Sequence, residues 1–243
     1  MYEIIFFCIW FAAGFINGIS GLGAALVAVP VILQFIEPQQ VVPVATALAM
    51  IICTEIGILY MRYCLVKQLV FLIISSIPGL ILGAYILLII PVPILLFCIG
   101  CVMIAYVCWQ ILHKKVNAAA PEKKYAVFLA GFSSGLLSSS VSFGGPPVAM
   151  YALHAHWGQK ETISTMSIFV TVSTCIALGI FIYTGLFTKE VMHWCGIGAV
   201  AVSLGLFTSI PFVKYIKIHV FRRILFAIIG FGGITCIVNS FLK

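Results

Sequence analysis

The sequence predicts an all-α integral membrane protein with about eight hydrophobic segments, arranged as two inverted repeats. Of its 243 residues, 63% are hydrophobic and only 8% are charged, and the mean hydropathy is +1.24. An ordinary soluble domain carries roughly 25% charged residues, so this composition cannot form a water-soluble surface. The apolar blocks 4–112 and 125–242 are each long enough for several spans rather than a single anchor.

Six of the segments have the length of an ordinary spanning helix, about 19 to 23 residues. They cover residues 43–61, 68–90, 92–112, 162–183, 191–213 and 224–242. The other two, 4–36 and 125–156, would be roughly 45 to 50 Å long as continuous helices, against a hydrocarbon core of about 30 Å. Both contain stretches rich in glycine, serine or proline, which interrupt a membrane helix. We therefore expect each to be a broken, re-entrant hairpin.

The two hairpin segments also resemble each other in sequence. Residues 14–18, GFING, match residues 131–135, GFSSG, at an offset of 117, and about three ordinary spans follow each. We expect a first repeat at 1–112, a basic cytoplasmic linker at 113–124 and a second repeat at 125–243. Three crossings per repeat is an odd number, so the second repeat would be inverted relative to the first, as in many secondary transporters.

The formal net charge of +7 comes from lysines and arginines in the breaks between apolar segments, which indicates membrane topology rather than nucleic-acid binding. If all eight segments crossed the membrane once, eight of these thirteen residues would lie on one side of the membrane and five on the other. Two re-entrant hairpins would leave only Lys189 and Lys243 outside. The stronger asymmetry favours the hairpin topology, with the protein in the cell membrane.

The glycine-rich breaks are the most informative features for function. A half-helix that begins inside the membrane directs free N–H groups and a positive dipole end into a cavity, where they attract anions. We expect these donors at residues 21–24 and 142–145, although glycines there could instead serve only close helix packing. The candidate substrate-binding residues are Asn17, Ser20, Gly21, Gly23, Ala24, Ser138, Ser142, Phe143, Gly144, Gly145 and Pro146.

Glu55 lies inside an apolar span, where carboxyl groups often handle protons, and it is a candidate for proton coupling. Alternatively, it lies close enough to the helix end to reach interfacial water or Arg62. His154 and His156 could form a titratable gate, but their position at the end of a hairpin favours an interfacial role.

Hydroxyl side chains on the spans could line a polar path, or could instead bond their own helix backbone. The candidates are Thr46 and Thr54 in the first half, with Thr165 and Thr171, as well as Ser164, Ser173 and Thr174, in the second. Cys53 and Cys175 occupy nearly corresponding places in the two halves, where a thiol is more often a packing residue than a ligand of a sulfur-containing substrate.

No enzyme signature is present. The sequence has no phosphate-binding P-loop, no HExxH and no aspartate. The nine cysteines lie mostly in apolar runs without the spacing of metal ligands. We expect no catalytic activity, no cofactor, no metal site and no ATP-driven transport.

The stretch 14–23, GFINGISGLG, followed by Pro30, and the stretch 144–147, GGPP, followed by Tyr151, resemble the paired signatures of the TauE/SafE sulfite exporter family. The resemblance extends over essentially the whole chain. It implies a permease for small anions, with sulfite, sulfoacetate and other organosulfur or carboxylate compounds as the substrate class. The chain departs from the family pattern at Ala24 and Ala25, where members often have more glycine, and near Glu161, where they often have a basic residue.

These observations together predict a secondary transporter that moves a small anion by alternating access. Its expected partners are the anionic substrate and the lipid bilayer, with no nucleic acid, and a homodimer is compatible with the sequence. One alternative is a membrane scaffold or assembly factor that moves nothing. Another is a cation or metal permease that uses Glu55 and the histidines, which would need more converging ligands than the sequence offers.

Overall fold

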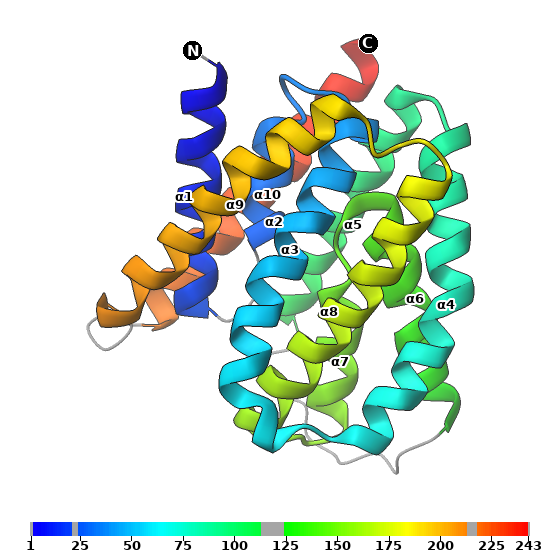
Figure 1. Ribbon diagram of the computed structural model, residues 1–243, viewed down its shortest axis with the longest axis vertical. Coiled ribbons are helices and arrows are strands. Elements are labelled where there is room, and N and C mark those ends of the chain that lie inside the picture. The colour runs from blue at the N-terminus through cyan, green and yellow to red at the C-terminus, as the bar shows by residue number, and fades with distance from the viewer. Residues whose placement is uncertain (1, 21–23, 113–123, 213–217, 243) are drawn as a thin grey trace.

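The protein is helical throughout the part described by the structure, a computed structural model that covers residues 2–20, 24–112, 124–212 and 218–242 (Figure 1). The first half consists of α1 (Tyr2–Ser20), α2 (Ala24–Ile32), α3 (Pro38–Tyr60), the short 3-10 helix η1 (Met61–Tyr63), α4 (Val66–Ile89) and α5 (Val92–Leu112). The second half consists of α6 (Lys124–Val141), α7 (Gly145–His154), α8 (Gln159–Tyr183), α9 (Lys189–Ser209), η2 (Ile210–Phe212) and α10 (Ile218–Leu242). Except for Lys124, which begins α6, the predicted linker lies outside the described residues.

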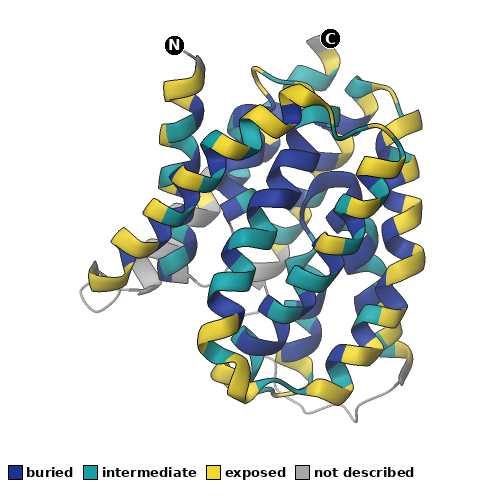
Figure 2. Cartoon of the chain, viewed as in Figure 1, coloured by how far each residue is buried: buried dark blue, intermediate teal, exposed yellow. Residues whose placement is uncertain are grey.

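Among the described residues, four helical segments are long and apolar enough to cross a membrane: Pro38–Tyr63, Val66–Ile89, Gln159–Tyr183 and Lys189–Ser209. Large apolar side chains cover the outer face of α4, where Phe71, Ile74 and Ile81 are more than half exposed, and exposed positions follow the outside of the helices in Figure 2. Water disfavours such a surface, whereas lipid tails solvate it. The prediction of an all-α membrane protein is confirmed.

Both long segments are interrupted. α6 ends at Val141 and α7 begins at Gly145, while α1 ends at Ser20 and α2 begins at Ala24, with residues 21–23 outside the described part. In Figure 1, α1 descends from the N-terminal end of the molecule and α2 turns back towards it. By contrast, α6 rises from the opposite end and α7 returns there. The two hairpins therefore open towards opposite ends of the molecule.

The helices of the two halves pack against each other in matching pairs. α1 packs along α9 and α6 packs along α4, while α3 crosses α8 and α5 crosses α10. Small residues allow these close approaches. Gly14 lies against the carbonyl of Val202, and Gly131 lies against Ser75 and the carbonyl of Leu72. This packing brings the inner ends of both hairpins to the centre of the bundle.

Candidate functional site

The turn between α6 and α7 has a specific backbone conformation. Ser142 has a φ of 60°, and the chain folds back so that its N–H donates to the carbonyl of Ser138 at 3.0 Å. The N–H of Phe143 donates to the carbonyl of Leu137 at 3.1 Å. The expectation that both N–H groups face a cavity is therefore wrong, because they satisfy the last carbonyls of α6.

The next two residues lead into α7. The buried hydroxyl of Ser134 donates to the carbonyl of Gly144, which fixes the turn against α6. Gly144 precedes the first residue of α7, Gly145, and no backbone carbonyl of the described residues accepts from either N–H. These two amides stand at the positive end of the α7 dipole.

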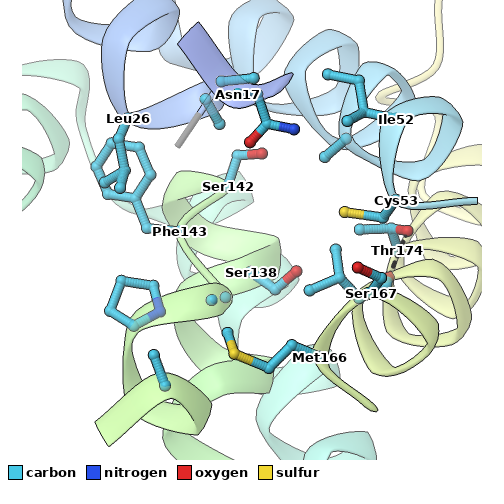
Figure 3. A pocket seen from close by; sticks show the side chains of 18 of the residues that line it. Asn17, Leu26, Ile52, Cys53, Ser138, Ser142, Phe143, Met166, Ser167 and Thr174 are labelled. Carbon is cyan, nitrogen blue, oxygen red and sulfur yellow. Dashed lines mark hydrogen bonds between the residues drawn. The ribbon is translucent and has the colours of Figure 1, made fainter. Parts of the chain in front are cut away.

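A cavity of about 80 Å³ lies beside this turn, at the centre of the bundle (Figure 3). A buried water molecule needs a cavity volume of about 10–15 Å³, so this cavity has room for several water molecules or a small ion. α1, α2, α3, α5, α6, α7 and α8 all contribute to its lining. Both hairpins therefore reach one shared space.

The polar part of the lining consists of neutral groups. In Figure 3 the Asn17 amide and the Ser142 hydroxyl point towards each other, and Ser138, Ser167 and Thr174 lie around the same space. Among the described lining residues there is no aspartate, glutamate, lysine or arginine. The site offers an amide, hydroxyls and the two N–H groups at the start of α7, all of which can donate to an anion.

Most of the predicted substrate-binding residues come together at this cavity. Those that line it are Asn17, Ala24, Ser138, Ser142, Phe143, Gly144, Gly145 and Pro146. Gly21 and Gly23 lie outside the described residues. Ser20 is the last residue of α1, and its side chain is likewise outside the described part.

None of the four predicted path-lining threonines belongs to the lining of the cavity. Thr46 is fully buried beside the cavity, with its hydroxyl 3.4 Å from that of Ser142. Thr54 and Thr171 meet where α3 crosses α8. Thr165 accepts a hydrogen bond from the N–H of Leu65 at 3.0 Å, next to the start of α4. Thr46, Thr54 and Thr171 also donate to carbonyls of their own helices, which the sequence left as the alternative role.

Glu55 does not line the cavity either. Its Oε1 accepts a hydrogen bond from the Ser203 hydroxyl of α9 at 2.9 Å, which places the carboxyl group between α3 and α9. His154 and His156 are exposed at the end of the second hairpin, in agreement with an interfacial position.

Sequence reasoning missed two polar residues of the lining, Tyr106 on α5 and Ser167 on α8. One tyrosine or serine within an apolar helix has no distinguishing pattern, and only the packing of that helix brings it to the cavity. Thr174 and Cys53 were considered from the sequence, and both lie in the lining. The cysteine occupies the side formed by α3 (Figure 3).

Comparison with known proteins gives one result that covers nearly the whole chain. The family model described as Sulfite exporter TauE/SafE matches residues 6–236. Neither a curated protein nor a solved structure gives a significant match. The matched range includes all of the second hairpin, the first hairpin from Phe6 onward, and every described residue that lines the cavity. The chain therefore belongs to the TauE/SafE sulfite exporter family, a family of membrane transporters.

Proposed function

We propose that the protein is a secondary transporter that moves a small anion through the central cavity by alternating access between two inverted repeats. The observation that carries this proposal is the turn from α6 to α7, which brings a helix N-terminus and serine hydroxyls to a small cavity inside the bundle. Helix N-termini are general anion-binding sites. Sulfite, a small organosulfur compound or a carboxylate fits the chemistry of these donors.

The anion would be held by dipoles and hydrogen bonds. The N–H groups of Gly144 and Gly145 lie at the start of α7, and the next two residues, Pro146 and Pro147, have no N–H. The hydroxyl of Ser138 and the amide of Asn17 reach the same space. Hydrogen bonds to an ionised group are roughly twice as strong as neutral ones, so a few such donors can stabilise an anion where water is scarce.

The packing supports the proposal of inverted repeats. Two helix pairs have counterparts made of the corresponding helices of the other half: α1 packs on α9 as α6 packs on α4, and α3 packs on α9 as α8 packs on α4. Gly100 of α5 faces the Gly233 carbonyl, and Gly233 of α10 faces the Gly100 carbonyl. A reciprocal contact of this kind is expected where corresponding helices meet at a two-fold axis.

The distribution of described cations supports the proposed orientation. Arg62, Lys67 and Lys160 are exposed in or near η1, the start of α4 and the start of α8, which lie at the end of the molecule opposite both termini in Figure 1. Lys189 begins α9 at the other end. We assign the face with the three cations to the cytoplasm.

The test is anion flux into proteoliposomes that contain the purified protein, with sulfite, sulfoacetate and a small carboxylate compared. In the variant Gly144→Val, the Cβ would lie 2.8 Å from the Cβ of Ser138, so the side chain crowds the turn and flux should fall at least about tenfold, the equivalent of roughly 1.4 kcal/mol. The matched control is Gly179→Ala, where nothing lies within 4 Å of the added Cβ.

Saturable anion flux that is lost in Gly144→Val and retained in Gly179→Ala would support the proposal, provided both variants elute as folded protein. If Gly144→Val fails to fold, Ser138→Ala removes one donor of the same site and should weaken anion affinity. Flux of divalent metal ions in place of anions would favour the cation permease. No flux of any solute would favour the scaffold.

A further inference from the structure

Glu55 is an intramembrane carboxyl group that the anion cavity does not use. One oxygen, Oε1, accepts from Ser203 at 2.9 Å. The other, Oε2, is buried and has no hydrogen-bond partner among the described residues. Nor does Glu55 form an ion pair within the described part, so the expected alternative of pairing with Arg62 is not found there. A carboxyl oxygen without a donor is the atom at which a proton can bind.

α3 has different faces towards the cavity and towards α9. Ala49, Ile52 and Cys53 line the cavity. Leu48, two helical turns before Glu55 on the same face, packs against Gly198 of α9. A proton at Glu55 would therefore act on the contact between α3 and α9, which belong to different halves, and would not touch the anion.

Among the described residues, Ser203 donates to the Glu55 carboxyl group, and none of the titratable groups on the elements around α3 is hydrogen bonded to it. Those on α9 belong to its first two turns, whereas Ser203 follows two turns later. The set comprises Cys53, Tyr60, Arg62, Tyr63, Lys67 and Tyr85 on α3, η1 and α4; Cys98, Cys101, Tyr106 and Cys108 on α5; Tyr125 on α6; Tyr151 and His154 on α7; Lys160, Glu161, Cys175 and Tyr183 on α8; and Lys189, Glu190, His193 and Cys195 on α9.

The equivalent contact in the other half has no carboxyl group. Thr54 and Thr171 are separated by 117 positions, and the same separation makes Val172 the counterpart of Glu55 in the second half. Gly14 and Gly131 are counterparts in the two halves, and they contact Val202 and Leu72, respectively. The residues that follow, Ser203 and Ile73, are therefore counterparts as well. The interface of α8 with α4 is therefore apolar at this place, whereas that of α3 with α9 is polar. Helix packing alone does not require the Glu55–Ser203 pair.

We propose that Glu55 is a proton-binding site that couples proton movement to anion transport. This inference rests on the function proposed above. A hydronium ion from the water phase transfers a proton to Oε2: one O–H bond of hydronium breaks, an O–H bond forms at Oε2, a water molecule is left, and the carboxylate becomes neutral. Protonation turns an acceptor into a donor at the contact with α9, so the two states of Glu55 favour different packing of the two halves. Because alternating access requires these halves to move, proton binding and anion binding are coupled through α3.

The experiment measures anion flux and internal pH together, in proteoliposomes that contain a pH-sensitive dye. With an imposed sulfoacetate gradient and equal starting pH, the wild-type protein should move protons along with the anion. In Glu55→Gln, anion flux down its own gradient should persist while the proton signal falls at least about tenfold, and an imposed pH gradient should no longer accumulate the anion. Glu37→Gln removes an exposed carboxyl group at the start of α3 and should behave like wild type.

Anion flux without proton movement in the wild-type protein would overturn the inference, and so would proton coupling that survives Glu55→Gln. If Glu55→Gln does not fold, Ser203→Ala retains the carboxyl group and removes its donor. That variant should shift the pH at which flux is half-maximal, and an unchanged pH profile would count against a proton site at Glu55. Absence of all anion flux in the wild-type protein would instead refute the proposed function itself.

Discussion

The hydroxyl oxygens of Thr54 and Thr171 lie 3.5 Å apart where α3 crosses α8, and the two residues are separated by 117 positions. The same separation relates the GFING and GFSSG stretches of the two hairpins. Residues related by a two-fold axis approach each other only near that axis, so this contact marks its position in the proposed inverted repeat. If the two halves exchange conformations, the Thr54–Thr171 distance stays the same while distances away from the axis change.

The first prediction concerns crosslinks at and away from this axis. In a background without native cysteines, a disulfide in Thr54→Cys/Thr171→Cys should form readily and leave anion flux within about twofold, because both states keep the pair together. The off-axis control is Thr46→Cys/Ser142→Cys, whose native hydroxyls lie 3.4 Å apart. Oxidation of this second pair should stop flux, and reduction should restore it. Equal inhibition by both disulfides would contradict exchange about this axis.

The second prediction concerns the anchor of the α6–α7 turn. Ser134→Ala removes the hydroxyl that donates to the Gly144 carbonyl, and a buried acceptor without a donor costs about 1–3 kcal/mol. We expect the dissociation constant for the anion to rise about tenfold, as measured by calorimetry on the purified protein. In Ser133→Ala the lost hydroxyl bonds only carbonyls of its own helix, and affinity should change little. Similar losses in both variants would argue against a role for the anchor.

The third prediction concerns the crossing of α5 and α10. In Gly100→Ala the added methyl group would lie 2.6 Å from the Gly233 carbonyl oxygen, and overpacking of this kind typically costs about 1–3 kcal/mol. Thermal unfolding of the detergent-solubilised protein should therefore begin at a lower temperature. Nothing lies within 4 Å of a Cβ at Gly230, so Gly230→Ala should unfold like wild type. A melting temperature unchanged in Gly100→Ala would show that the two helices can separate without loss.

The fourth prediction tests whether the cavity is the anion path. With the other eight cysteines replaced, Cys53 in the cavity lining should react with a small methanethiosulfonate reagent, and the reaction should block flux. A transported anion such as sulfoacetate should slow labelling severalfold, because both compounds compete for one space. A protein that keeps only Cys175, which is exposed on α8, should be labelled at a rate that the anion does not change.

The broken hairpins could be predicted because their cause is local. Two segments exceed the thickness of the hydrocarbon core, and each contains residues that interrupt a helix. The direction of individual N–H groups could not be predicted in the same way. The φ of 60° at Ser142 turns its own N–H and that of Phe143 onto α6 carbonyls, which leaves Gly144 and Gly145 as the candidate backbone donors at this turn. The amino-acid sequence alone does not specify the φ angle of Ser142.

The remaining site residues depend on how helices from both halves pack. Glu55 and Thr54 are neighbours in sequence, yet one contacts α9 and the other contacts α8. Tyr106 reaches the cavity only because α5 packs beside the second hairpin. Periodicity indicates which residues share a helix face, but the identity of the facing helix is a tertiary property. For this reason the sequence located the hairpin residues of the site better than those on the spanning helices.

The neutral lining of the cavity also has an electrical consequence. Because the described lining residues contain no lysine, arginine, aspartate or glutamate, an anion transported through this cavity as proposed would keep its full charge. A potential of about 100 mV contributes roughly 2.3 kcal/mol per elementary charge, equivalent to about a fiftyfold concentration ratio. An interior-negative voltage would drive an unaccompanied anion outwards, whereas one proton per monovalent anion would cancel that force. In the proposed proton-coupled transport, the number of protons moved per anion would therefore decide whether net transport responds to the membrane potential.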